Sequence, residues 1–176
     1  MSRLKRIQML SRALIWAVSA FMGWWSYEYA HRIWDNILTA EWGMYNGVDD
    51  ALIMTTAMRV WAVAYYAPVV IIAFVSYWFA VRLLYLYRQG VIFDVRAARA
   101  LMGLGWAFVG IALVDTFITA TERWFLTLWN ADGPLAPRYY YDAGDITIGL
   151  AGLGFCLIGW ITREGLFLVR ENEGFI

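Results

Sequence analysis

The sequence is poor in the residues that form common active sites. Among its 176 residues it has one cysteine, Cys156, and one histidine, His31. One copy of the chain therefore cannot form an internal disulfide, a cysteine and histidine zinc site or a bis-histidine haem site. It also lacks a nucleophile elbow, a phosphate-binding P-loop, an HExxH metal motif and a glycine-rich dinucleotide fingerprint. We therefore predict no catalytic residues, no metal site and no enzymatic activity.

Charged residues are also scarce, at 16% of the chain, and the 14 basic and 14 acidic residues leave no net charge. A nucleic-acid-binding protein would concentrate a basic excess, so nucleic acid is not an expected partner. Hydrophobic residues make up 62% of the chain, and the mean hydropathy is +0.55. A soluble domain of this size cannot bury so much apolar surface, which indicates that lipid surrounds much of the chain.

Four long apolar runs define the expected architecture. A hydrocarbon core of about 30 Å requires roughly 20 mostly apolar helical residues, and runs of this length are found at about 10–29, 60–84, 98–118 and 143–164. They predict an all-α integral membrane protein, a four-transmembrane-helix bundle that forms a single domain over residues 1–176. The connections are predicted as two outer caps, the first with an amphipathic helix, an inner hairpin and a tail, at about 30–57, 119–142, 85–97 and 165–176.

The distribution of Lys and Arg predicts how these helices thread the membrane. Ten of the 14 basic residues lie in the N-terminal flank, the hairpin and the tail, whereas the other side has Arg32, Arg59, Arg123 and Arg138. Basic residues are retained on the cytoplasmic side of membrane proteins. Both termini and the hairpin are therefore predicted to be cytoplasmic, in a bacterial inner membrane.

Two series of small residues predict close helix packing. Small residues let helix backbones approach each other in a membrane. We expect the two seams to pack on each other inside the bundle, and the alternative is that one seam faces a partner protein, a second copy or a pigment. The first seam lies in the third run and the second in the fourth run: Ala100, Gly103, Ala107 and Gly110, then Gly149, Gly152 and Gly159.

Three ionisable residues in or beside the apolar runs are candidates for a structural or functional role. Arg59 and Asp115 are expected at similar depth near the outer surface, and because unpaired charges are costly in a membrane, we predict that they form an ion pair. A proton pathway is disfavoured, since no second acid or histidine continues it through the core. His31 is the one imidazole that could hold a pigment or a metal, but its place just outside the first run favours a headgroup or capping contact.

The inner hairpin and the tail have recognisable local chemistry. Gly90 is expected to end the second helix, and Asp94 is positioned to cap the helix that carries Arg96 and Arg99. The hairpin is predicted at the inner leaflet, with its apolar tip, Ile92 and Phe93, buried and its arginines towards phosphates. The tail ends on an apolar pair, which we expect to dock on the protein or the membrane: Phe175 and Ile176.

Together, the hairpin motif Gly-x-Ile-Phe-Asp and the tail motif Arg-Glu-Gly…Glu-Asn-Glu-Gly-Phe-Ile resemble the bacterial membrane family catalogued as domain of unknown function 2975. The resemblance implies a four-helix inner-membrane protein, often encoded beside small helix-turn-helix regulators, with no established enzymatic activity. It supplies no catalytic residues, and the heavier Trp and Tyr content on the outer side departs from a typical member. The matching positions are Gly90, Ile92, Phe93, Asp94, Arg99, Arg163, Glu164, Glu171, Asn172, Phe175 and Ile176.

These features favour a non-catalytic accessory or scaffold subunit that docks on a larger membrane complex of respiratory or photosynthetic type. The alternative is a membrane-bound regulator that partners a cytoplasmic transcription factor, because the hairpin is basic and the tail is charged. A small transporter or quinone-interacting protein is least favoured, since paired buried charges, broken helices and cofactor motifs are lacking. No cofactor is predicted, although an aromatic content of 18% leaves room for a bound lipid, quinone or pigment.

Overall fold

The structure is a computed structural model that describes residues 3–34, 56–127 and 143–173. All secondary-structure elements in this part of the chain are helices, which confirms the predicted all-α class. The predicted outer caps fall largely outside the described residues, including most of the expected amphipathic helix after Trp34. The four helices are α1 (Arg3–Ile33), α3 (Thr56–Arg88), α4 (Val95–Thr127) and α5 (Ala143–Glu173).

Each helix is longer than the apolar run that predicted it. The helices have 31 to 33 residues, which at about 1.5 Å per residue corresponds to roughly 46–50 Å. Counting apolar residues detects only the part that fits in hydrocarbon, whereas the helical backbone continues into the charged flanks. The predicted tail from residue 165 is therefore the last part of α5 as far as Glu173.

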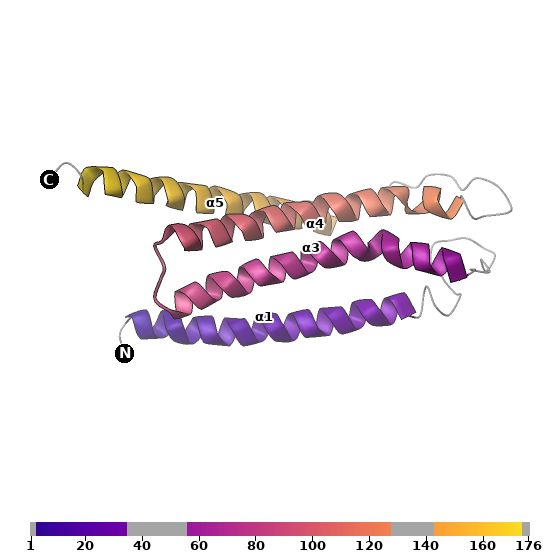
Figure 1. Cartoon of the computed structure of the whole chain (residues 1–176), viewed down its shortest axis with the longest axis horizontal. Helices are drawn as coiled ribbons and strands as arrows, with labels where there is room; N and C mark the ends of the chain where they lie inside the picture. The colour runs from indigo at the N-terminus through magenta and orange to yellow at the C-terminus, as the bar shows by residue number, and fades with distance from the viewer. Residues whose placement is uncertain (1–2, 35–55, 128–142, 174–176) are drawn as a thin grey trace.

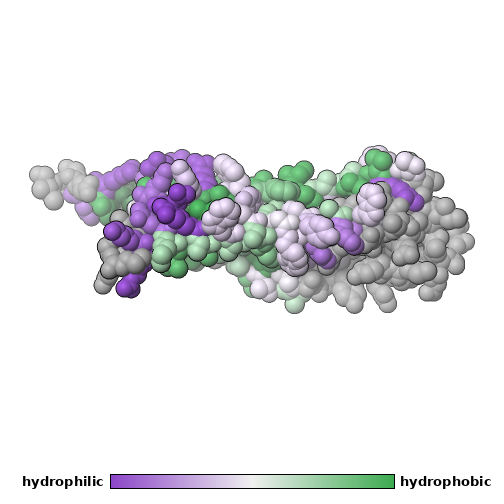
Figure 2. Space-filling model, turned by 90° about the horizontal axis from the view of Figure 1, so that it is seen from below, coloured by the Kyte–Doolittle hydropathy of each residue, from purple (hydrophilic) through white to green (hydrophobic). Residues whose placement is uncertain are grey.

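Three of the four helices are long and apolar enough to cross a membrane: α3, residues Val95–Thr121 of α4 and residues Ala143–Asn172 of α5. The helix α1 is of similar length but less apolar, because it contains Arg12, Glu28 and several Trp, Tyr and Ser residues. Figure 2 shows hydrophilic residues gathered at the end that carries the two termini, and apolar or neutral residues over the middle. This distribution is typical of a membrane protein.

The helices form an open row. Close backbone contacts join α1 to α3, α3 to α4, and α4 to α5, and within the described part no other pair of helices makes them (Figure 1). The predicted bundle is therefore not closed within these residues, because α1 and α5 make no close backbone contact with each other. The buried apolar residues lie on the two central helices: Met58, Ala62, Val69, Leu83, Leu86, Ala97, Ala98, Ala100, Leu104, Ala107, Ala112 and Ile118.

Candidate functional site

The helices α4 and α5 approach each other through glycines. A methyl group added to Gly105 would lie 2.6 Å from the carbonyl oxygen of Gly152, and one added to Gly159 would lie 2.6 Å from Cγ of Met102. Such distances are too short for a real side chain, so both positions require glycine. The thiol of Cys156 donates a 3.6 Å hydrogen bond to the carbonyl oxygen of Met102 in the same interface. This confirms close packing for the small residues of α5.

The contacting residues of α5 follow a spacing of three and four. On α5 the series runs through Asp145, Gly149, Gly152, Cys156 and Gly159, and each of these residues contacts α4. Residues that repeat at this spacing lie on one stripe of the helix. Two helices that pack along such a stripe have a small angle between their axes. The seam predicted from Gly149, Gly152 and Gly159 is therefore an internal packing surface.

The other predicted seam faces a different neighbour. A methyl group on Gly103 would lie 2.6 Å from Cζ of Phe79, and one on Gly110 would lie 3.6 Å from Cγ2 of Ile72, so both glycines face α3. Ala100 is buried in a cluster with residues of α3. The expectation that the two seams pack on each other is thus wrong: α4 uses one stripe for α3 and another, around Gly105, for α5.

The inner hairpin has the geometry that its sequence predicts. Gly90 has a φ of 82°, the left-handed region in which glycine is favoured. Its N–H bonds to the carbonyl of Tyr87, and the N–H of Val91 bonds to the carbonyl of Leu86, each at 3.0 Å. This pair of bonds is a Schellman motif. The side chain of Val91 packs on the cluster that contains Leu86, which stabilises the end of α3.

Asp94 caps α4 as predicted. Its carboxylate accepts hydrogen bonds from the backbone N–H of Arg96 at 2.7 Å and from the Arg96 guanidinium at 3.0 Å. These bonds, the one from the guanidinium above all, lower the pKa of Asp94 below its ordinary value of 3.8. The carboxylate therefore stays ionised and available to the helix N-terminus at all physiological pH values.

The burial expected for the hairpin tip and for the end of the tail stays a prediction. Phe93 is 81% exposed, so the described residues do not bury its side chain, whereas Ile92 is partly buried. Glu171 and Asn172 lie exposed in the last turn of α5, whereas the predicted docking pair, Phe175 and Ile176, lies outside the described residues. The helix α5 extends past the hairpin towards the C-terminus (Figure 1).

Helix contacts place one arginine of each helix at a common level. Ser19 of α1 and Tyr77 of α3 share a 3.0 Å hydrogen bond, Phe79 faces Gly103, and Gly159 faces Met102. These contacts fix which positions of neighbouring antiparallel helices lie at the same height along the helix axes. By this register, four arginines lie within about one helical turn, or 5.4 Å, of each other along the axes. We call this level the arginine belt; its members are Arg12, Arg82, Arg99 and Arg163.

Polar groups also gather towards the opposite ends of the helices. The hydroxyl of Thr116 donates to the carboxylate of the buried Asp145 at 3.3 Å, joining α4 to α5. Tyr65 of α3 donates to the carbonyl of Ile118 at 2.9 Å and bonds to the hydroxyl of Thr121. These bonds satisfy hydroxyls that would otherwise be costly in an apolar surrounding. Sequence reasoning did not find them, because isolated Tyr and Thr residues carry no pattern.

The register of α3 and α4 bears on the predicted ion pair. Gly110 faces Ile72 and Ile118 bonds to Tyr65, so Asp115, which lies between them, is level with residues 67 and 68. Arg59 is eight residues further along α3, which separates it from Asp115 by about 12 Å along the axis. Asp115 interacts electrostatically with Tyr29 of α1. The Arg59–Asp115 ion pair stays a prediction, and the register does not favour it.

His31 lies exposed in the last turn of α1. Its ring contacts that of Tyr27, with 6.0 Å between the centroids. Among the described residues, no three His, Cys, Asp or Glu side chains are grouped to hold a metal ion. The capping or headgroup contact expected for His31 stays a prediction.

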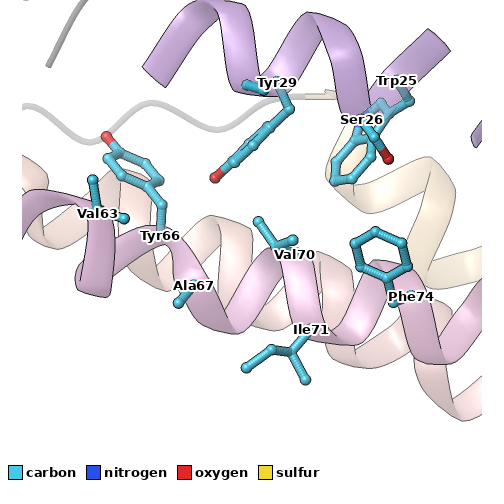
Figure 3. A pocket seen from close by; sticks show the side chains of 10 residues that line it. Trp25, Ser26, Tyr29, Val63, Tyr66, Ala67, Val70, Ile71 and Phe74 are labelled. Carbon is cyan, nitrogen blue, oxygen red and sulfur yellow. The ribbon is translucent and has the colours of Figure 1, made fainter. Parts of the chain in front are cut away.

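An open cleft of about 370 Å³ separates part of α1 from α3. Figure 3 shows Tyr66 and Val70 of α3 turned towards α1, with the hydroxyl of Tyr29 directed into the space between the helices. The sequence did not predict this cleft, because it depends on how far α1 stands from α3. Its walls consist of Trp25, Ser26, Tyr29, Ala30, Val63, Tyr66, Ala67, Val70, Ile71 and Phe74.

The fold and these contacts define a class: an all-helical protein with three helices suited to span a membrane. No family model matches the chain, and no curated protein or solved structure shows significant similarity to it. The resemblance drawn from the hairpin and tail motifs therefore stays a prediction. Function has to be argued from the contacts of this chain.

Proposed function

We propose that all four helices span the bilayer, with both termini and the hairpin in the cytoplasm of a bacterium. The arginine belt supports this, because it includes Arg12 of the less apolar α1 at the same height as the arginines of the other helices. About 20 residues from the belt, or roughly 30 Å, lead to Arg32 near the end of α1 and to Ala143 at the start of α5. A hydrocarbon core of about this thickness, with one edge at the arginine belt, is therefore spanned by α1 as it is by the neighbouring helices.

The orientation rests on the same belt. Three of its arginines are exposed on the helix surfaces, and the side chain of Arg163 is half-exposed. Exposed arginines at a membrane boundary extend towards lipid phosphates and are retained on the cytoplasmic side. Arg88 and Arg96 of the hairpin lie beyond the belt on the same side, together with Lys5.

The function that we propose is that of a non-catalytic accessory or scaffold subunit, which docks on a larger membrane complex. The observation that carries this proposal is the open row of helices. The helix α5 uses one stripe to contact α4, while Leu150, Ile158 and Ile161 on its other side are exposed. Gly154 lies between them, with open space around it. We call Leu150, Gly154, Ile158 and Ile161 the free face of α5, and a partner helix could approach it closely at Gly154.

The test uses a substitution that affects a partner helix but leaves the contact with α4 intact. Gly154→Leu would fill the open space on the free face, so a stoichiometric complex isolated in mild detergent should lose its partner, while the melting temperature of the isolated chain is not lowered. Ala13→Leu, at an exposed position of α1, is the matched control and should retain the complex. Native mass measurement of the wild type as a lone monomer in several mild detergents would contradict the proposal.

A membrane-bound regulator is the second candidate, and the last turns of α5 favour it. They extend beyond the hairpin (Figure 1) and expose Phe167, Leu168 and Val169, which a cytoplasmic partner could contact. Replacing residues 167–176 with a Gly/Ser segment should then change transcription of neighbouring genes at constant protein level. An unchanged transcript profile would reject this candidate.

A further inference from the structure

The depth of the cleft between α1 and α3 matches one leaflet of a bilayer. Its walls on α3 run from Val63 to Phe74, which is 11 residues or about 16 Å along the helix axis. Half of a hydrocarbon core measures about 15 Å. Counting about 20 residues from Arg82 of the arginine belt puts the far edge of the hydrocarbon near Ala62, one residue from where the cleft begins. The cleft therefore extends from the headgroup boundary to about the middle of the bilayer.

The chemistry of the walls suits a hydrocarbon chain. Val63, Val70 and Ile71 supply aliphatic surface, and aromatic rings such as that of Phe74 supply flat surface. Figure 3 shows the Tyr29 hydroxyl directed between Tyr66 and Val70, whereas Phe74 lies further along α3. A volume of about 370 Å³ is within the range of small-molecule sites, roughly 300–1,000 Å³. The cleft is open over part of its surface, so a chain can enter it from outside the protein.

A basic residue stands where the headgroup of such a lipid would lie. Arg59 precedes Val63 by four residues, and Val63, Ala67 and Val70 follow at helical spacing, so all four lie on one stripe of α3. One turn beyond the hydrocarbon edge is the zone of the phosphates. A guanidinium has five N–H donors and can bind a phosphate while it retains another contact.

We propose that the cleft between α1 and α3 is a phospholipid site, in which Arg59 binds the phosphate and the cleft holds one acyl chain. The lipid belongs to the leaflet at the Arg59 end of the helices. It would fill the gap between α1 and α3 and so complete the packing of α1, which contacts no other described helix closely. This inference requires α1 to lie in the bilayer, but it depends neither on the direction of threading nor on a docking partner.

The test measures lipids retained by the full chain in native mass spectrometry. The probes are phosphatidylglycerol and a diacylglycerol with the same chains, which lacks the phosphate. The wild type should retain phosphatidylglycerol roughly tenfold better than diacylglycerol, because a charged hydrogen bond stabilises binding by an amount of that order. Arg59→Gln should remove this preference. Equal retention of the two lipids by the wild type would overturn the phosphate assignment.

Two alanines of α3 provide the matched pair for the cleft. Ala67 lines the cleft, whereas Ala64 lies exposed one turn away on the same helix. Ala67→Phe fills the space that the acyl chain needs and should lower retention of both lipids about tenfold, while Ala64→Phe should leave it unchanged. Equal retention by the two variants would show that the lipid binds elsewhere.

A labelling measurement on the wild type covers the case in which Ala67→Phe fails to fold. Phosphatidylglycerol with a photoreactive group in its acyl chain should label peptides that contain the cleft walls, 25–30 and 63–74, several-fold more than those of α4 and α5. Even labelling of all four helices would overturn the proposal. The cysteine accessibility of α1, described below, separates this outcome from a failure of α1 to span the membrane.

Discussion

Gly152→Ala tests whether backbone contact between α4 and α5 holds the two helices together. A methyl group at this position would lie 2.7 Å from the carbonyl oxygen of Gly105 and 2.9 Å from the backbone nitrogen of Val109. To restore an ordinary contact of at least 3.4 Å with the carbonyl, the helices must move apart by about 0.7 Å. Because both neighbours are backbone atoms, no side chain can rotate away to relieve the contact.

The expected change in unfolding free energy comes from comparing Gly152→Ala with Gly154→Ala. Gly154 lies two residues away on the same helix, with nothing within 4 Å of an added methyl group. Both substitutions change glycine to alanine within α5, so the gain in helix propensity, about 0.5–1 kcal/mol, cancels between them. The difference in unfolding free energy is then the overpacking cost at Gly152, roughly 1–3 kcal/mol.

The assay is thermal unfolding of the two variants in the same detergent. Gly152→Ala should melt roughly 2–12 °C below Gly154→Ala, and Gly154→Ala should melt at or slightly above the wild type. Equal melting temperatures for the two variants would refute the reasoning, because they would show that α4 and α5 do not approach at Gly152.

Three further substitutions test local contacts by the same melting measurement. Gly90→Ala should destabilise the chain by about 1–2 kcal/mol, because its φ of 82° is costly for a residue with a Cβ; an unchanged melting temperature would contradict the turn geometry. Asp94→Ala should lower the melting temperature more than Asp94→Asn. Since the pKa of Asp94 is lowered in the fold, its contribution is complete above its ordinary value and is lost as the pH falls below about 4; a constant difference between wild type and Asp94→Ala from pH 7 to pH 3 would argue against the cap. Tyr65→Phe removes the hydrogen bond to the carbonyl of Ile118 and should cost about 0.5–1.5 kcal/mol, whereas the exposed Tyr85→Phe should not.

Local sequence chemistry predicted the hairpin well. Gly90 and Asp94 have the roles that their residue types favour, because a positive φ and a helix cap depend on a few neighbouring residues. The four helices were likewise found from apolar runs, since hydrocarbon thickness sets a length that can be counted. Their ends were placed too far inward, because charged flanks remain helical outside the hydrocarbon.

Relations between helices could not be predicted in the same way. Gly103 and the glycines of α5 were recognised as packing residues, but Gly105 was not, although Gly105 meets α5 whereas Gly103 faces α3. The spacing of small residues along one helix identifies the stripe that packs, but it does not identify which helix packs against that stripe. The cleft beside Tyr66 depends on the distance between two helices, to which the sequence gives no direct signal.

The most direct test of this account asks whether α1 crosses the membrane. Single cysteines replace Lys5 and His31, at opposite ends of α1, in a chain that carries Cys156→Ser. A membrane-impermeant thiol reagent added to intact cells should label His31→Cys, whereas Lys5→Cys should react only in inside-out vesicles. Labelling of both cysteines from the same side would contradict a spanning α1, and the reverse pattern would contradict the proposed orientation.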